Sequence, residues 1–237
     1  NCLVVVEKNR NKGVQHILKD FPETEVILLD DGYQHRWIKA GFNILITPYY
    51  YPYYKDSLMP VGNLRESKKG AERANAIVFS KTPENINPTL KKGMLERLHL
   101  FAHQKAYFSH INYCTWRCIS TNKEFTSDQK YSITLVSGIV NPKPLVEQLE
   151  NKGHTISQIT FKDHHSYTTY DAQKILAKYN ADESAKKLIL TTEKDATKLR
   201  ELLAHFEDVN FYYIPIDIAF SEQEIFDRQI LNYVAKN

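Results

Sequence analysis

Residues 26–36 read VILLDDGYQHR, and this stretch decides the fold. Its first four residues are all apolar, as in a strand that is buried in a parallel sheet. Two adjacent carboxylates, Asp30 and Asp31, follow the apolar run, and Gly32 then allows a sharp turn. Ligands of open α/β sheets bind beyond the carboxyl ends of the strands. The stretch therefore predicts an α/β fold with a metal–phosphate site at this point. The alternative is a strand that runs into a plain polar turn.

Three polar side chains directly after the turn favour a site. Gln34, His35 and Arg36 offer an amide, an imidazole and a guanidinium in succession, which a simple turn does not require. An apolar strand that ends in Asp also holds Mg²⁺ in P-loop NTPases. Because adjacent strand residues point to opposite faces, one carboxylate is expected to touch the ion directly. We expect Asp31 to be the Mg²⁺ ligand and Asp30 to be its neighbour in the site or a cap on the following turn.

Apolar runs alternate with helical patterns along the chain, which predicts βαβ units and mostly parallel sheets flanked by helices. In the first part, the expected strands are residues 3–6, 25–29, 43–47 and 76–80, and the expected helices are residues 12–19 and 89–102. In the last part, the expected strands are residues 131–136, 154–161, 188–192 and 210–214, and the expected helices are residues 144–152, 169–179, 194–205 and 221–236.

Aromatic and polar residues interleave from residue 105 to residue 125, which predicts an antiparallel ribbon. The sequence thus predicts an α/β domain in residues 1–104, a β-ribbon linker in residues 105–126 and a smaller α/β domain in residues 127–237. Ser221 and Glu224 have the spacing of a capping box for the last helix. Thr192 is the expected cap of the helix that follows it.

The composition bounds the class of protein. A chain of 237 residues with 42% hydrophobic content can form one large or two small domains. A net charge of +3 without a long basic run argues against a nucleic-acid partner. The three cysteines, Cys2, Cys114 and Cys118, are expected to be free thiols in a reducing compartment. Cys114 and Cys118 could also be half of a metal site. Without a signal peptide or a long apolar run, we expect this part of the protein to be soluble.

Six sequence blocks together resemble a known family. DDGYQHR (30–36) is similar to the DDGxQHR signature of the tetraacyldisaccharide 4′-kinases, the lipid A 4′-kinases of Gram-negative bacteria. Five further blocks follow in the family's order: MPVGNLRE (59–66), RANAIV (73–78), SGIVNP (137–142), DHHSY (163–167) and TTEKDA (191–196). Six blocks in register are a far more specific signal than any one of them.

The resemblance implies an incomplete P-loop-kinase-like core with a smaller C-terminal α/β domain. It implies transfer of a phosphoryl group from ATP, with Mg²⁺, to the 4′-hydroxyl of a tetraacyldisaccharide 1-phosphate, a lipid A disaccharide precursor. It also implies a peripheral position at the cytoplasmic face of the bacterial inner membrane. In the family, a His of the DHH motif works with an acidic residue from the N-terminal part, and this role carries over to His164. The implied catalytic residues are Asp30, Asp31, Glu66 and His164, and the implied phosphate- or substrate-binding residues are Arg10, Gln34, His35, Arg36 and Arg65.

From the residues alone, several alternatives stay open. Arg65 and Glu66 could form an exposed salt bridge, and Arg36 could be a surface arginine. The DHH motif could ligate a metal, although three adjacent residues in extended chain cannot easily converge on one ion. Residues 47–60 contain five tyrosines in a Pro-broken loop (49–54). These could sit at a bilayer interface or grip acyl chains, or they could pack on one another.

The family's phosphate loop, GxxxxGK[ST], is missing, because none of the eight glycines is followed by Lys. We therefore expect the chain to be a C-terminal fragment of the kinase, rather than a paralogue without the loop, and to be inactive by itself. Two other functions remain open: another P-loop-like phosphotransferase or NTPase, and a non-catalytic binding domain.

Overall fold

The computed structural model describes residues 3–236. The chain forms two compact units, which are described separately below. Unit 1 comprises Asn1–Ile111 and Ile218–Asn237, and unit 2 comprises Asn112–Asp217. The C-terminal segment thus belongs to unit 1, whereas the sequence pattern predicts it within a C-terminal domain of residues 127–237.

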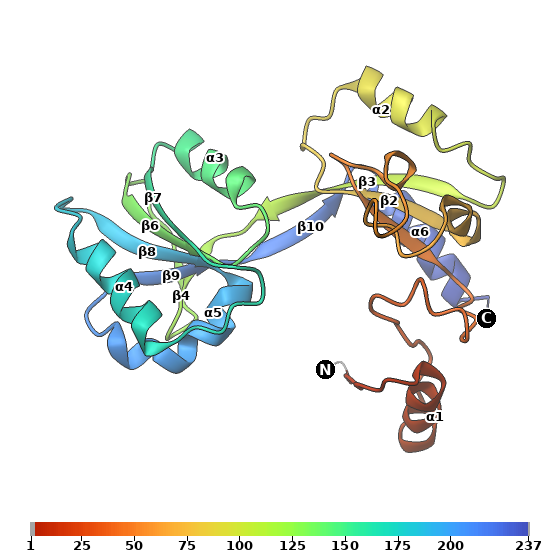
Figure 1. Cartoon of the computed structure of the whole chain (residues 1–237), viewed down its shortest axis with the longest axis horizontal. Coiled ribbons are helices and arrows are strands. Elements are labelled where there is room, and N and C mark those ends of the chain that lie inside the picture. Colours follow the sequence, from red (N-terminus) through yellow and green to blue (C-terminus); the bar gives the residue numbers. More distant parts are fainter. Residues whose placement is uncertain (1–2, 237) are drawn as a thin grey trace. The chain divides into compact units, whose positions relative to one another are not determined.

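Unit 1 is built on a four-stranded sheet in the order β1-β2-β3-β10 (Figure 1). Its strands are β1 (Ile44–Pro48), β2 (Ala76–Ser80), β3 (Lys105–Tyr113) and β10 (Ile216–Phe220). The first three are parallel, with Ile46 opposite Val78 and Val78 opposite Tyr107. Because β2 is apolar along most of its length, it can be buried on both faces. Phe79 stacks on Phe108 on one face, with ring centroids 4.9 Å apart, and Val78 packs with Tyr107 on the other.

An asparagine side chain caps the N-terminus of each of two helices in unit 1. Asn9 accepts a hydrogen bond from the Lys12 N–H at the start of α1 (Arg10–Asp20). Asn87 does the same for Thr89 in α2 (Pro88–Glu96), where Pro88 occupies the first turn without losing a helical hydrogen bond. These helices agree with the predicted ones to within a few residues at their N-terminal ends, although α2 ends well before the predicted residue 102.

The last helix, α6 (Gln223–Val234), has no capping box. Its N-cap residue is Glu222, and the side-chain oxygen of Gln223 accepts a hydrogen bond from the Phe220 N–H instead. The predicted pairing of Ser221 with Glu224 is therefore wrong. The helix is held by aromatic packing, since Phe226 stacks on Phe220 (4.1 Å) and meets the edge of Tyr107 (5.0 Å).

Two predicted strands of unit 1, residues 3–6 and 25–29, are not formed. An extended segment becomes a strand only when a neighbour accepts and donates its backbone hydrogen bonds. Within residues 3–236 no strand pairs with either segment. Their apolar side chains are accordingly exposed, Val6 to 96% and Leu28 to 88%.

An antiparallel ribbon pairs β3 with β10, a strand that lies outside residues 105–126. The Cys114 N–H donates to the Pro215 carbonyl (2.9 Å), and the Ser221 N–H donates to the Phe108 carbonyl (3.0 Å). Residue numbers rise along one strand as they fall along the other, so β3 and β10 run antiparallel. The chain leaves unit 1 along β3 and returns along β10. β10 is not among the strands predicted from the sequence.

Unit 2 has a six-stranded sheet in the order β5-β4-β9-β8-β6-β7. The four strands β9, β8, β6 and β7 are parallel, and β4 and β5 add an antiparallel edge. The bounds are β4 (Trp116–Cys118), β5 (Glu124–Phe125), β6 (Ser132–Ser137), β7 (Thr155–Thr160), β8 (Lys187–Thr192) and β9 (Phe211–Ile214). The four parallel strands lie within one or two residues of the predicted ones.

Helices cover both faces of this sheet (Figure 1). The helix α3 (Lys143–Asn151) packs on one face through Leu145 and Leu149. The helices α4 (Thr169–Asn180) and α5 (Glu193–Leu199) pack on the other face, and the 3₁₀ helix η3 (Arg200–His205) continues α5. Alternation along β8 explains this arrangement, because Leu188 and Leu190 face α3 while Ile189 faces the opposite cluster. The chain is therefore an α/β protein with mostly parallel sheets.

Candidate active site

The DDGYQHR segment forms a tight turn in unit 1. Asp31 has a positive φ of 45°, and Gly32 lies so close to Leu29 that a Cβ added to Gly32 would be 2.7 Å from the Leu29 Cβ. The turn closes with a hydrogen bond from the His35 N–H to the Gly32 carbonyl (3.0 Å). The glycine is thus required by a close contact, while Asp31 itself adopts the left-handed conformation, which Asp tolerates better than most residues.

Glu66 lies at the centre of a charged cluster. Its carboxylate accepts hydrogen bonds from Arg36 (2.7 Å) and from both terminal nitrogens of Arg73 (2.8 and 3.2 Å). The hydrogen bond from Arg73 is the main reason that the pKa of Glu66 lies below its ordinary value, and Arg36 adds to the effect. Two arginines bound to one carboxylate leave a net positive charge, which suits a site for an anion.

Tyr33 fixes the position of Arg73. The guanidinium of Arg73 lies over the Tyr33 ring, 4.8 Å from its centroid, and donates to the Tyr33 carbonyl (3.0 Å). The Tyr33 hydroxyl donates to the Gly70 carbonyl (2.8 Å), and burial raises its pKa to about 12. Arg73 was not among the predicted site residues, although it opens the RANAIV block that contributed to the resemblance. Its role depends on contacts that no local pattern reports.

Asp31 pairs with Arg65 at the surface. The distance between Arg65 Nη1 and Asp31 Oδ2 is 2.9 Å, and the two side chains are 60% and 70% exposed. Such a pair contributes little to stability, so the carboxylate can exchange the arginine for another cation. Within residues 3–236 no group of three or more His, Cys, Asp or Glu side chains gathers as a metal site. The exposed carboxylate of Asp31 beside Asp30 fits Mg²⁺, which needs only one or two protein carboxylates when phosphate oxygens supply further ligands.

Two clefts of about 590 Å³ each lie beside the turn, and His35 lines both. The first also includes Arg10, whose guanidinium donates to the Glu7 carbonyl (2.6 Å) at the start of α1. Gln34 lines neither cleft. Both clefts are rich in basic side chains: Lys8, Arg10 and Lys12 in the first, and Arg36, Lys39, Lys69 and Arg73 in the second.

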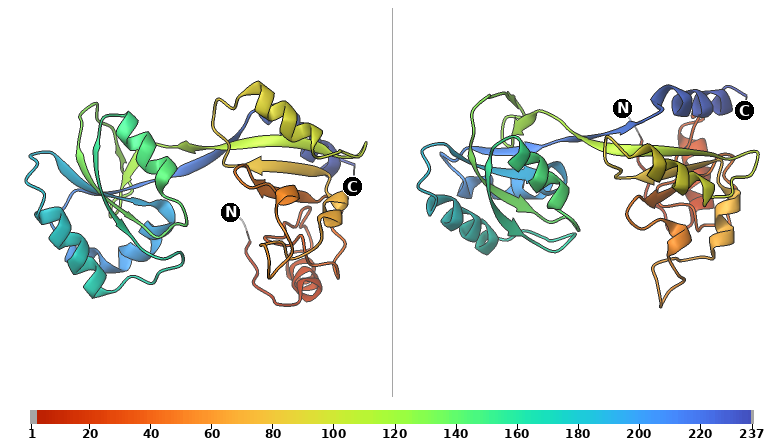
Figure 2. Two further views of the ribbon diagram at one scale, coloured as in Figure 1. Left: turned by 45° about the horizontal axis from the view of Figure 1, so that its top comes forward. Right: turned by 90° about the horizontal axis from the view of Figure 1, so that it is seen from above.

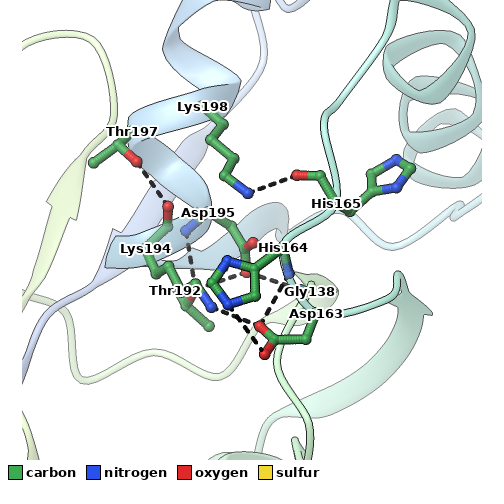
Figure 3. Close-up of polar contacts among 9 residues, drawn as sticks. All are labelled: Gly138, Asp163, His164, His165, Thr192, Lys194, Asp195, Thr197 and Lys198. Carbon is green, nitrogen blue, oxygen red and sulfur yellow. Dashed lines mark hydrogen bonds and ion pairs between the residues drawn. The ribbon is translucent and has the colours of Figure 1, made fainter. Parts of the chain in front are cut away.

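His164 lies beside Asp163 in the DHH motif of unit 2 (Figure 3). It has a positive φ of 60°, and its side chain is 81% exposed. Its Nε2 lies 3.6 Å from the carboxylate of Asp163. Asp163 in turn pairs with Lys194 at 2.5 Å, and this bond is the main reason that the pKa of Asp163 is lowered. The imidazole is therefore accessible and lies beside a carboxylate that is held in place.

His165 has a different environment. Its Nε2 lies 3.0 Å from the carboxylate of Asp171, and its ring stacks on Phe161 with centroids 4.6 Å apart. Burial opposes ionisation of Asp171, but hydrogen bonds from His165 and Thr168 outweigh it and keep the pKa of Asp171 below its ordinary value. Asp171 also completes the capping box of α4 with Thr168. The contacts of His165 are those of a structural residue.

Asp195 connects two motifs of unit 2 (Figure 3). Its carboxylate is buried and accepts hydrogen bonds from the Gly138 N–H (2.8 Å) and the Thr192 hydroxyl (2.7 Å). Thr192 caps α5, as the sequence predicted. The sequence offered no signal for the contact with Gly138, which lies in the SGIVNP block.

No helix within residues 3–236 is long and apolar enough to span a bilayer. The three residues Asp31, Arg36 and Glu66 with their partners lie in unit 1, and His164 lies in unit 2. Residues from different sequence blocks therefore meet within each unit.

Comparison with known proteins points to the same family as the six sequence blocks. Residues 1–235 match the model of the tetraacyldisaccharide-1-P 4′-kinase family. The chain is 35% identical over 247 residues to a tetraacyldisaccharide 4′-kinase of Bacteroides fragilis, covering 99% of this chain and 65% of that protein. It is 38% identical to the enzyme of that name from Cytophaga hutchinsonii, covering 98% of this chain and 64% of that protein.

A solved structure shares the fold. It is the crystal structure described as the "apo" form of LpxK from Aquifex aeolicus in complex with ATP. It matches with a TM-score of 0.66 and 24% identity, over 97% of this chain and 64% of that chain. The chain thus spans about two thirds of the length of these relatives. Because the family model covers nearly every residue, the chain belongs to the tetraacyldisaccharide-1-P 4′-kinase family.

Proposed function

We propose that the full-length protein transfers the γ-phosphoryl group of ATP to the 4′-hydroxyl of a tetraacyldisaccharide 1-phosphate, the reaction for which its relatives are named. The observation that carries the proposal is the position of an exposed carboxylate, Asp31, beside basic clefts in a chain that belongs to this family. Unit 1 would supply the nucleotide- and acceptor-binding part of the enzyme.

The polar groups of unit 1 bind and orient the phosphates in this proposal. Arg36 and Arg65 bind phosphate oxygens, with Arg10 as a further contact, because guanidinium groups match phosphate geometry. Glu66 holds Arg36 and Arg73 in fixed orientations. Gln34 and His35 offer hydrogen bonds to the sugar. Phosphoryl transfer depends chiefly on such positioning and on charge neutralisation.

Asp31, assisted by Asp30, holds Mg²⁺. When bound, Mg²⁺ neutralises charge that develops on the phosphates. In unit 2, His164 accepts the proton of the acceptor hydroxyl, a task for which an exposed imidazole near neutral pH is suited. Asp163 lies beside its ring and would stabilise the imidazolium. Since the acceptor is a lipid, we also propose that the protein works at the cytoplasmic face of the inner membrane.

The test is a phosphorylation assay with the full-length gene product, ATP, Mg²⁺ and detergent-dispersed tetraacyldisaccharide 1-phosphate. We expect a lipid product that is heavier by one phosphoryl group and that carries label from γ-labelled ATP. The same assay with the 237-residue chain should give no product, because this chain contains no GxxxxGK[ST] loop. Hydrolysis of ATP without labelled lipid would contradict the proposal and favour an NTPase or another phosphotransferase.

A further inference from the structure

Three apolar side chains are exposed on one short loop of unit 1. Leu58 is 49% exposed, Met59 64% and Val61 88%. We call residues 57–64 the tip loop. The right-hand view of Figure 2 shows an orange loop in this part of the chain that reaches out from the rest of unit 1. An exposed apolar group of this kind on a protruding loop is unusual unless it meets an apolar partner.

The tip loop is held rigidly. The buried carboxylate of Asp56 accepts hydrogen bonds from the Ser57 N–H (2.7 Å) and from the N–H and side-chain amide of Asn63 (3.1 and 3.3 Å). Further backbone bonds close the loop, from Met59 to Leu64 (3.0 Å) and from Leu64 to Ser57 (3.0 Å). A Cβ on Gly62 would lie 2.3 Å from Asp56 Oδ1, so the turn requires glycine. These bonds fix the backbone of the loop, on which the three apolar side chains are exposed.

Tyrosines lie at the base of the loop. Tyr53 and Tyr54 pack into the core beside Phe79, as in the alternative interpretation of the tyrosine-rich segment. Tyr50 and Tyr51, in contrast, are 62% and 49% exposed. The Tyr51 hydroxyl donates to the Lys55 carbonyl (3.1 Å), which places it next to Asp56. Exposed tyrosines beside an apolar tip are typical of the water–bilayer interface.

The charge around the loop is positive. Lys55, Arg65, Lys68 and Lys69 flank the tip, against two acidic residues, Asp56 and Glu66. Asp56 is occupied by the loop N–H groups, and Glu66 by two arginines. Arg65 pairs with Asp31, whereas the three lysines are not neutralised by Asp56 or Glu66. Lysines near a membrane surface are attracted to anionic lipids.

We propose that the tip loop inserts into an anionic phospholipid bilayer, with Leu58, Met59 and Val61 below the headgroups and the lysines at the phosphates. The inference rests on the proposed function for its membrane location and names the element that makes the contact. Three side chains cover too little area for a specific protein interface, whereas a few apolar side chains with basic neighbours suit binding in the interface plane.

The first experiment is flotation of the full-length gene product on vesicles of equimolar phosphatidylcholine and phosphatidylglycerol. The double variant Met59→Ser/Val61→Ser should lower the vesicle partition coefficient by about tenfold, which corresponds to about 1.4 kcal/mol. The matched control, Leu90→Ser, removes a leucine that is 56% exposed on α2 and should bind as the wild type does. Lys69→Gln should weaken binding to these vesicles and leave binding to pure phosphatidylcholine unchanged. Unchanged partition of the double variant would overturn the proposal.

The second experiment reports the environment of the loop directly. An environment-sensitive dye is attached at Val61→Cys in a protein whose Cys2, Cys114 and Cys118 are replaced by Ser. We expect its emission to shift to the blue on the vesicles. No shift on vesicles that bind the protein, or a shift only with the detergent-dispersed lipid acceptor, would overturn insertion and assign the loop to another partner or to the substrate's acyl chains.

The same variants separate this inference from the proposed function. Phosphorylation of the detergent-dispersed acceptor needs no bilayer, so Met59→Ser/Val61→Ser should retain it while losing vesicle binding. If the wild type binds vesicles through the loop and yet phosphorylates no acceptor, the proposed function fails and the insertion stands. Far-UV circular dichroism should show the variants to be folded, because both side chains are exposed.

Discussion

The carboxylate of Asp195 accepts a hydrogen bond from the backbone N–H of Gly138, at 2.8 Å and 57 residues away along the chain. The bond joins the start of α5 to the turn after β6. A Cβ on Gly138 would lie 2.9 Å from Asp195 Oδ1, so the turn and the carboxylate are in close contact. Asp195 thus connects the SGIVNP and TTEKDA blocks, which lie far apart in the sequence.

Asp195→Ala should destabilise unit 2, because it leaves the buried Gly138 N–H without its acceptor and removes the partner of the Thr192 hydroxyl. A buried donor that loses its partner costs about 1–3 kcal/mol, and two affected groups place the expected loss at the upper end of that range. The measurement is the free energy of unfolding in urea. Glu193→Ala, at an exposed neighbouring position, is the control. Equal stabilities of the two variants would show that the Gly138 contact is not formed.

Local patterns predict a strand well where its burial depends on its own residues, and poorly where the strand depends on a distant partner. The parallel strands β6 and β8 were predicted from their own apolar runs, since these runs are buried whatever their neighbours are. Residues 25–29 have an equally apolar run, yet no strand within the described part of the chain pairs with them. A strand forms only beside a partner strand, and an apolar run does not by itself show whether that partner is present.

The site residues also fall into two groups, those that a local motif indicates and those whose role depends on distant contacts. Motif residues such as Asp31 and His164 could be selected from the sequence because they stand in short distinctive blocks. Arg73 and Asp195 could not be selected as site residues, since their importance comes from contacts with Glu66 and Gly138 that only the folded chain creates. The capping pair Ser221 and Glu224 failed for a related reason, because the strand β10 extends up to Phe220 and α6 begins at Gln223.

Glu66→Gln should make the free energy of unfolding less dependent on pH in the acidic range. The folded-state pKa of Glu66 lies below its ordinary value of 4.5, mainly because of Arg73. A carboxyl group whose pKa is lowered in the folded state stabilises the fold at pH values above its unfolded-state pKa. This stabilisation is lost as the pH falls through the folded-state pKa. The wild type should therefore lose more stability than Glu66→Gln between neutral pH and about pH 4. Urea unfolding at both pH values measures the difference, with the exposed Glu72→Gln as control. A wild-type loss no larger than that of Glu66→Gln would contradict the ion-pair assignment.

Asp31→Ala in the full-length gene product should lower kcat by at least about two orders of magnitude, because it removes the proposed carboxylate ligand of Mg²⁺. Folding should be retained, since the side chain is 70% exposed and pairs only with an exposed arginine. Steady-state kinetics and thermal unfolding check the two halves of this expectation. Asp128→Ala, an exposed Asp of unit 2, should change neither. Near-normal turnover by Asp31→Ala would exclude the metal role.

The two histidines of the DHH motif should respond in opposite ways. His164 is exposed beside Asp163, so His164→Ala should lower kcat by about 10²–10⁴-fold and leave ATP affinity and stability nearly unchanged. Protonation of an imidazole removes its ability to accept a proton, and the acidic limb of the pH–rate profile should therefore flatten in this variant.

His165 pairs with Asp171 and stacks on Phe161, so His165→Ala should instead lower the free energy of unfolding by about 1–3 kcal/mol. The variant removes one of the hydrogen-bond partners of the largely buried Asp171 carboxylate, which keeps Thr168, and it also removes the stacked ring. Its kcat should stay close to the wild-type value at temperatures where the variant is folded. Steady-state kinetics and urea unfolding on both variants give the full comparison. If His165→Ala loses turnover while remaining as stable as the wild type, the catalytic imidazole is His165. If neither variant loses turnover, the proton leaves by another route and the motif has a structural role, because its contacts would then serve only to hold the loop between β7 and α4.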